Sequence, residues 1–122
     1  MNNQSKSVKI SSVILKTSTG FEYYNYDDII RFEADRNYTI VHTSVNTRPS
    51  RAMCNLAEIQ RCFPYERYYR CHKSHIINLN YVRKLYTVDH KLLMEDNSQV
   101  PVSDICLKEI KKMSNPGYKA FT

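Results

Sequence analysis

The chain has 122 residues, of which 42% are hydrophobic and only two are glycine, and its formal net charge is +6. This length fits one domain with one hydrophobic core, and no apolar run approaches the roughly 18 to 20 residues of a membrane span. So few glycines disfavour a glycine-rich loop for nucleotide phosphates, whereas the positive charge permits binding to nucleic acid, anionic membrane or acidic protein.

Short apolar runs follow a polar start. Residues 1–7 are expected to form a flexible lead-in, with no apolar segment behind them that would indicate a signal peptide. Each later run is rich in valine, isoleucine, tyrosine or phenylalanine and predicts a strand. The ten predicted strands cover residues 8–16, 21–26, 28–34, 38–43, 48–53, 67–71, 75–82, 82–88, 91–96 and 99–103. Short strands with short polar connections indicate a mainly β fold, which we expect to be an antiparallel sandwich.

A short helix is predicted over residues 55–63, in the middle of the chain. Asn55 is a good N-cap, and Glu58 follows three residues later, which is the spacing of a capping box. Apolar residues within the segment recur on one helical face. Pro64 is expected to end this helix, because proline lacks the backbone N–H that a helix interior requires.

A second helix is predicted near the C-terminus. Ser103 can cap it, and Asp104 lies in the first turn, where the helix dipole favours an acid. The sequence Asn-Pro-Gly at residues 115–117 is expected to end it. The predicted domain therefore covers residues 8–113, and residues 114–122 are predicted to form a C-terminal tail.

Residues 71–75 combine a cysteine, two histidines, a lysine and a serine. Cys71, His72 and His75 are ligand types that zinc prefers, but a structural zinc site needs four ligands. In an extended strand, Cys71 and His75 would share one face while His72 would point to the other, so His72 could not act as a base for the thiol. We therefore expect no enzyme, cofactor or metal, with zinc kept as an alternative hypothesis. The four cysteines include no C-x-x-C pair, which favours reduced thiols in a cytoplasmic protein.

Positive charge is concentrated in one part of the chain. Between residues 67 and 91 a single acid, Asp89, opposes the basic residues Arg67, Arg70, Lys73, Arg83, Lys84 and Lys91. Polar side chains at predicted loops could donate hydrogen bonds to phosphates or base edges. These side chains are Arg36, Asn37, Tyr38, Lys73 and Ser74. From the residues alone, a nucleic-acid surface and a solvated basic face of a sheet both remain open.

Four blocks of sequence occur in a distinctive order. They are "YDDIIRFEADRNYTIVHT", "NLAEIQRCF", "YYRCHKSHIINLNYVRKL" and "QVPVS". Together they resemble the LytTR family of bacterial DNA-binding domains, over residues 8–113. The third block is the most diagnostic, since it matches the family pattern F/Y-x-R-x-H-x-S-x-x-V/I-N. Its matching positions are Tyr68, Arg70, His72, Ser74, Ile77 and Asn78.

The resemblance implies an elongated, multi-sheet antiparallel fold of about ten strands, with a short helix after the first hairpins. Loops at the sheet edges, not a recognition helix, would enter successive major grooves of double-stranded DNA. It also implies that the chain is the effector domain of a two-component response regulator, whose N-terminal receiver is phosphorylated and dimerises. Two copies would then bind a repeated site. The expected function is sequence-specific DNA binding by a bacterial transcription regulator.

The resemblance also implies roles for single residues. The family's base-contacting positions correspond here to Arg36, Asn37 and Tyr38 in one loop and to Lys73 in another. A third contact often comes from a basic residue at the position of Asp104. The carboxylate found here would repel phosphate and could accept a hydrogen bond only from a donor such as cytosine N4. Asp104 is therefore left out of the predicted interface.

Further roles follow for the diagnostic block. The residues expected to anchor phosphates are Arg70, Ser74 and Lys84. His72 is expected to hold the loop by a hydrogen bond, Ile77 to pack inwards, and Asn78 to be structural. A competing interpretation is a β-sheet protein-interaction module that binds an acidic partner through the same basic face. Similar affinity for a single duplex and for a random polyanion would favour that alternative.

Overall fold

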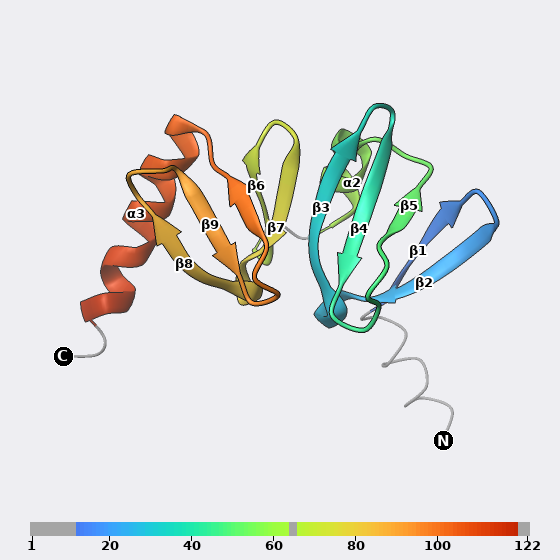
Figure 1. The fold of residues 1–122 in the computed structure, drawn as a ribbon, viewed down its shortest axis with the longest axis horizontal. Helices are drawn as coiled ribbons and strands as arrows, with labels where there is room; N and C mark the ends of the chain where they lie inside the picture. Colours follow the sequence, from blue (N-terminus) through green and yellow to red (C-terminus); the bar gives the residue numbers. More distant parts are fainter. Residues whose placement is uncertain (1–11, 64–65, 120–122) are drawn as a thin grey trace, which may run out of the picture.

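The computed structural model describes residues 12–63 and 66–119, with side chains as far as residue 113, and this part of the chain is mainly β. Two halves lie side by side along the longest axis, which gives the molecule an elongated shape (Figure 1). The described strands are β1 (Ser12–Thr17), β2 (Gly20–Asn25), β3 (Ile29–Asp35), β4 (Tyr38–Thr43), β5 (Ser50–Ala52), β6 (Tyr68–His72), β7 (His75–Asn78), β8 (Val82–Tyr86), β9 (Lys91–Met94) and β10 (Gln99–Pro101). The described helices are α2 (Leu56–Cys62) and α3 (Asp104–Lys119), with the 3-10 turns η1 (Tyr26–Asp28) and η2 (Leu79–Tyr81).

The described strands form three antiparallel sheets. The largest has the order β5-β4-β3-β7-β6, β1 pairs with β2, and β8, β9 and β10 make the third. The mainly β, multi-sheet fold with two helices confirms the expected fold class. The expected sandwich was wrong, because the hairpins group into three small sheets rather than two facing layers. α2 packs against the five-stranded sheet, and α3 covers the other half (Figure 1).

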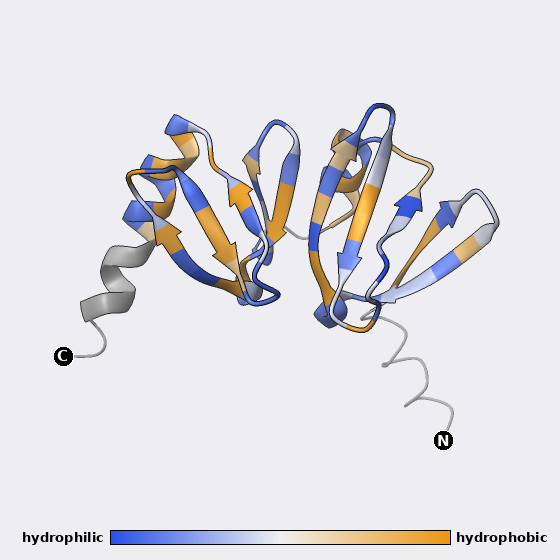
Figure 2. Cartoon of the chain, viewed as in Figure 1, coloured by the Kyte–Doolittle hydropathy of each residue, from blue (hydrophilic) through white to orange (hydrophobic). Residues whose placement is uncertain are grey.

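Two hydrophobic clusters form the core, one in each half, and β3 and β7 contribute to both. Consecutive strand residues point to opposite faces, so Ile76 joins the cluster beneath α2 while Ile77 joins the cluster beneath α3. In the first cluster the rings of Phe32 and Phe63 meet edge-on, with their centroids 4.8 Å apart. Figure 2 shows the apolar residues in the middles of the strands and hydrophilic residues at the turns. The inward packing expected of Ile77 is therefore confirmed.

The start of α2 follows the sequence prediction. The Asn55 side chain accepts a hydrogen bond from the Glu58 N–H, and the Glu58 carboxylate accepts one from the Asn55 N–H, both at 2.9 Å. This reciprocal capping box satisfies two backbone donors that the first turn leaves without partners. The helix ends at Cys62, where the Phe63 N–H still bonds to the Ile59 carbonyl at 3.2 Å. Residue 64, the expected stop, lies outside the described residues.

The start of α3 was also predicted correctly, but its end was not. The Ser103 hydroxyl accepts a hydrogen bond from the Cys106 N–H at 3.2 Å, as expected of an N-cap. The helix continues to Lys119, so residues 115–117 do not end it and much of the expected tail is helical. A proline removes only one backbone donor from a helix, and the backbone on both sides can remain helical. None of the described helices is long and apolar enough to cross a membrane.

The predicted strand over residues 75–82 is interrupted after Asn78. The Asn78 side chain is fully buried, donates to the Ile29 carbonyl at 2.8 Å and accepts from the Asn80 N–H at 3.0 Å. These bonds begin η2, through which the chain passes from the five-stranded to the three-stranded sheet. Asn78 is therefore structural, as expected. The lead-in expected at residues 1–7 lies outside the described residues.

Candidate nucleic-acid interface

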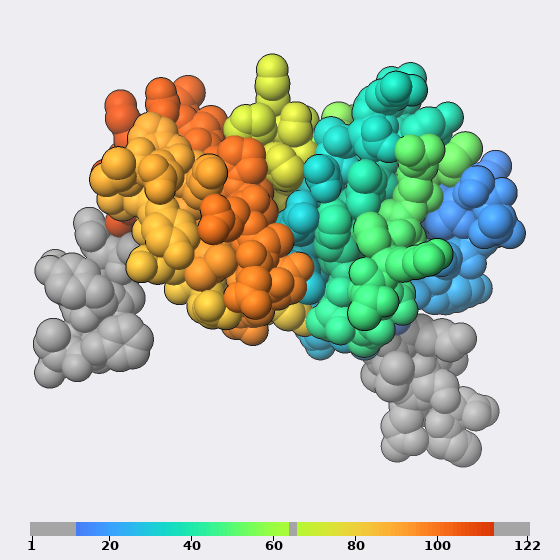
Figure 3. Space-filling view, in the orientation of Figure 1, coloured from blue at the N-terminus to red at the C-terminus, as the bar shows by residue number. Residues whose placement is uncertain are grey.

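Two polar hairpin turns lie at one end of the five-stranded sheet. Residues 36–37 join β3 to β4, and residues 73–74 join β6 to β7. β3 pairs directly with β7, and the Ala34 N–H donates to the Ser74 carbonyl at 2.9 Å, which holds the turns beside each other. Both project from the upper edge of the molecule, the first in cyan and the second in yellow (Figure 3). We call these two turns, together with the start of α3, the loop edge.

The start of α3 joins this edge through backbone hydrogen bonds. The Ser103 N–H donates to the Cys71 carbonyl at 3.0 Å, which places the helix N-terminus beside the end of β6. Asp104 Oδ1 lies 3.0 Å from His90 Nδ1, and both side chains are exposed to solvent. Asp104, at a position where the resemblance implied a basic residue, thus contacts a histidine from the β8–β9 connection.

The first turn presents the predicted residues of the 36–38 loop. Arg36 has a φ of 59°, in the left-handed region that tight turns use, and both Arg36 and Asn37 are exposed. Tyr38 is half-buried, and the guanidinium of Arg51 lies 5.4 Å from its ring centroid. Arg51 Nη2 also lies 2.6 Å from Asp35 Oδ2. Sequence reasoning missed Arg51, because its place beside this turn depends on the pairing of β5 with β4.

The second turn is supported by side chains from several elements. Arg70 donates from Nη1 to the Gln60 amide oxygen at 2.9 Å and from Nη2 to the Lys73 carbonyl at 2.6 Å. His72 Nδ1 accepts from the Ser74 N–H at 3.1 Å, so His72 holds the loop as expected. Lys73 is exposed, and its ammonium group makes no ion pair or hydrogen bond with any residue that the structure describes. Of the predicted residues here, Lys73 is therefore the most available to a ligand.

The prediction that His72 points away from the face of His75 was wrong. Residues 73–74 reverse the chain, so His72 and His75 are cross-strand partners whose ring centroids lie 5.6 Å apart. Cys71 is fully buried, its Sγ lies 3.6 Å from the Pro101 carbonyl oxygen, and burial raises the pKa of its thiol to about 12. Such a thiol is protonated and enclosed, which does not suit a nucleophile. Within the described residues, no group of three or more potential ligands could hold a metal ion.

A cluster of charged and polar side chains lies along β3, β4 and β7 on one face of the sheet. Glu33 Oε1 lies 3.0 Å from His42 Nε2 and 3.4 Å from Arg31 Nη1, and Glu33 faces His75 across the β3–β7 pair. Burial would raise the pKa of Glu33, but the hydrogen bond with His42 and the charge of Arg31 hold it below its usual value. Burial lowers the pKa of both histidines. At neutral pH the cluster therefore combines neutral histidines with one Arg–Glu pair.

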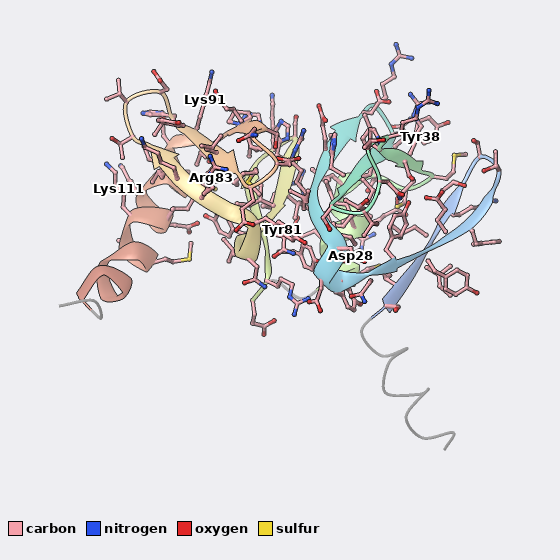
Figure 4. All side chains as sticks on the ribbon, turned by 60° about the horizontal axis from the view of Figure 1, so that its bottom comes forward. Asp28, Tyr38, Tyr81, Arg83, Lys91 and Lys111 are labelled. Carbon is pink, nitrogen blue, oxygen red and sulfur yellow. The ribbon has the colours of Figure 1, made fainter. Side chains whose placement is uncertain are left out.

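The opposite end of the sheet has a different character. A cavity of about 540 Å³ lies between the halves there, and its lining includes Thr43, Glu95 and Asp96. Figure 4 turns this end towards the viewer and places Asp28 and Tyr81 in it. Carboxylates at this end would repel phosphate, whereas the described loop edge presents exposed arginine and lysine side chains. Each end also carries the opposite sign, Asp104 at the loop edge and Arg48 at the other end, so it is the exposed basic side chains of the two turns that favour the loop edge as the surface that faces nucleic acid.

Comparison with known proteins is consistent with this geometry. The model of the LytTr DNA-binding domain family matches residues 20–115. Two heme-containing CO-sensing transcriptional regulators of Paraburkholderia xenovorans (strain LB400), RcoM 1 and RcoM 2, are 35% and 34% identical to the chain over 92 residues, which make up 70% of the chain and 33% of each relative. The sensory transduction protein LytT of Bacillus subtilis (strain 168) is 28% identical over 82 residues, or 65% of the chain and 29% of that protein.

A solved structure also matches. That structure, described as the LytTr DNA-binding domain of a putative methyl-accepting/DNA response regulator from Bacillus cereus, matches with a TM-score of 0.70 at 28% identity, and the match covers 84% of this chain and 94% of that one. The fold is therefore similar to that of an isolated LytTr domain. The chain spans about a third of the length of the curated relatives that it matches.

Proposed function

The chain belongs to the LytTr DNA-binding domain family, a family of transcription-regulator effector domains, and we propose that it binds double-stranded DNA sequence-specifically through the loop edge. The observation that carries the proposal is the pairing of β3 with β7, which fixes two exposed polar turns side by side. A major groove about 12 Å wide admits a two-stranded β-ribbon. Each hairpin end, at residues 36–37 and 73–74, is therefore narrow enough to enter a groove.

The exposed side chains of the turns suit base contacts. Lys73 can donate to guanine O6 or N7, Arg36 can do so with two donors, and Asn37 can pair with the N6 and N7 atoms of adenine. Tyr38 lies beside them at the start of β4 and can donate from its hydroxyl group.

The diagnostic block supplies the remaining contacts. Ser74 has a backbone that is already hydrogen-bonded, which leaves its hydroxyl to donate to a phosphate. Arg70 donates one N–H to the Lys73 carbonyl and one to the Gln60 amide oxygen, and its remaining N–H donors can bind a phosphate. We thus assign Arg70 two roles, as a support of the turn and as an anchor for the DNA backbone.

We also propose the wider setting that the resemblance implied. A receiver domain N-terminal to this chain would bring two copies together on a repeated DNA site, as in a two-component response regulator. The short share of each relative that the chain covers, and the name of the sensory transduction protein LytT, support a multidomain protein. A regulator of this kind acts where the bacterial chromosome lies, in the cytoplasm.

Selection of duplexes from a random library, followed by titration of the selected duplex, tests the proposal. Binding should weaken steeply as salt rises, because phosphate contacts release counterions. Lys73→Ala should cost about 1–3 kcal/mol of binding free energy and relax preference at one base pair. Lys111→Ala, which removes an exposed lysine from α3, is the matched control. Failure to select any duplex at low salt would refute the proposal, and equal affinity for a random polyanion would favour an acidic protein partner.

A further inference from the structure

We propose that Arg51 is a phosphate-binding residue at the flank of the loop edge and that Asp35 is the residue that positions it. The proposal rests on the proposed function, since it assumes that DNA lies along this edge. Arg51 comes from β5, a strand of three residues that the family resemblance did not single out. The proposal is based on the contacts that Arg51 makes with Asp35 on β3 and Tyr38 on β4.

The three residues share one face of the sheet. Asp35 on β3 is the pairing partner of Tyr38 on β4, and Arg51 on β5 is the partner of Ile40, two residues further along β4. Partners across a pair, and residues two apart on a strand, point to the same side. Arg51 therefore extends across β4 over the Tyr38 ring, with its guanidinium carbon 5.4 Å from the ring centroid, and reaches the Asp35 carboxylate at 2.6 Å.

The pairing leaves much of the guanidinium available. The side chain of Arg51 remains 59% exposed, and the hydrogen bond to Asp35 uses one of its amino groups. A guanidinium has five N–H donors in a planar fork, so several are free to meet a ligand. An ion pair this exposed stabilises a fold little. Its larger effect is to hold a flexible side chain in one orientation, which lowers the entropy lost when that side chain binds a ligand.

The place of Arg51 in the sheet points to phosphate and not to a base. The order β5-β4-β3-β7-β6 puts β5 on the side of the 36–37 turn that is remote from the 73–74 turn. Neighbouring strands are about 4.8 Å apart, so β5 lies roughly 10 Å from β3. From β5 the side chain reaches back over Tyr38 to Asp35, so its guanidinium lies on the face of the sheet beside the 36–37 turn and would meet the DNA backbone at the groove margin when the turns occupy the groove. A planar donor fork suits a phosphate there.

Affinity for the selected duplex, measured over a series of salt concentrations, tests Arg51. Arg51→Ala should weaken binding about tenfold and should reduce the slope of log affinity against log salt by about 0.9, the value for one phosphate contact. Arg48→Ala is the matched control. Arg48 is also an exposed arginine, but it lies in the connection that precedes β5, at the end of that strand remote from the loop edge. The control should leave both affinity and slope as in the wild type. Arg51→Lys keeps the charge but loses the planar fork of donors, so its affinity should lie between that of Arg51→Ala and that of the wild type.

Asp35→Asn tests whether Asp35 affects binding by positioning Arg51 or only through the negative charge of its carboxylate. Removing a carboxylate near DNA should tighten binding if only net charge matters. If Asp35 positions Arg51, the same substitution should instead weaken binding, and it should have little further effect in an Arg51→Ala background. Tyr38→Leu, which removes the ring face, should likewise weaken binding more than Tyr38→Phe. Thermal melting of each variant identifies any loss that arises from unfolding.

The outcomes distinguish this proposal from the one on which it rests. If the wild type binds no duplex, the function proposed above fails. If the wild type binds and Arg51→Ala matches Arg48→Ala in affinity and slope, the assignment of Arg51 alone is overturned. A loss confined to one base-pair position would also overturn it, by making Arg51 a base contact. Tighter binding by Asp35→Asn would refute the positioning role.

Discussion

Replacing Asn78 with alanine tests whether this residue of the diagnostic block acts through the fold and not through DNA. Asn78 lies at the end of β7 that is remote from the 73–74 turn, where the chain leaves one sheet for the other. Its amide connects the Ile29 carbonyl on β3 to the Asn80 N–H in η2. The substitution should therefore loosen the connection between the two halves while leaving every predicted DNA contact in place.

The size of the effect follows from burial. Ile29 is fully buried, so water cannot replace the hydrogen bond that its carbonyl loses, whereas Asn80 is exposed and its N–H can bond to solvent. One unsatisfied buried carbonyl, together with the small cavity left by the amide, should cost roughly 2–4 kcal/mol of unfolding free energy. This is a large part of the 5–15 kcal/mol that is typical of a domain, yet most molecules should remain folded.

Urea denaturation followed by circular dichroism measures this loss, and titration of the selected duplex under folding conditions measures affinity. Asn80→Ala is the matched control, because it removes an exposed amide and keeps the backbone N–H that Asn78 accepts from. Asn78→Ala should lower the urea midpoint well below that of the control. A normal midpoint combined with a large loss of affinity would refute the reasoning, since it would place Asn78 at the DNA.

Three further measurements test the structure. At pH 8, iodoacetamide should label exposed Cys62 well before Cys71, whose thiol is buried with a pKa raised to about 12, and mass spectrometry of labelled peptides would detect any other order. Phe32→Ala should lower the free energy of unfolding by about 3–5 kcal/mol in urea, and a loss below 1 kcal/mol would contradict its packing. Burial lowers the pKa of His42 and His75, so the unfolded chain binds more protons near pH 6. Stability should therefore fall as pH drops below about 6.5, and a rise would contradict this sign.

Features that depend on neighbouring residues in the sequence could be predicted well. The strand predicted over residues 38–43 has the same bounds in the structure, because its alternating pattern and flanking turns are local signals. The capping box of Asn55 and Glu58 is equally local and was found with both of its hydrogen bonds. For α3 the predicted start was correct but the predicted end was wrong. The Asn-Pro-Gly sequence at residues 115–117 was expected to stop the helix, but the backbone remains helical as far as Lys119.

Features that depend on strand pairing could not be predicted from one sequence. The hairpin turn makes His72 and His75 partners, although alternation along a single strand had separated them. The bond from Arg70 to Gln60 joins β6 to α2, and the position of Arg51 depends on the order of five strands. Alternation fixes the face on which a side chain lies but does not say which strand lies beside it. For this reason the sequence identified the turns of the loop edge but not the side chains that support them.

The geometry of the loop edge depends on a single strand pair. β3 leads into the 36–37 turn and β7 follows the 73–74 turn, so the pairing of these two strands sets the distance between the turns. The same two strands are buried on both faces, by the cluster beneath α2 on one side and the cluster beneath α3 on the other. A shift of register in this pair would require both clusters to repack, which close-packed cores resist. The spacing of the turns proposed to contact DNA is therefore held by the hydrophobic core of the whole domain. Substitutions of Ile76 or Ile77 should for this reason alter DNA affinity although neither residue is expected to contact DNA.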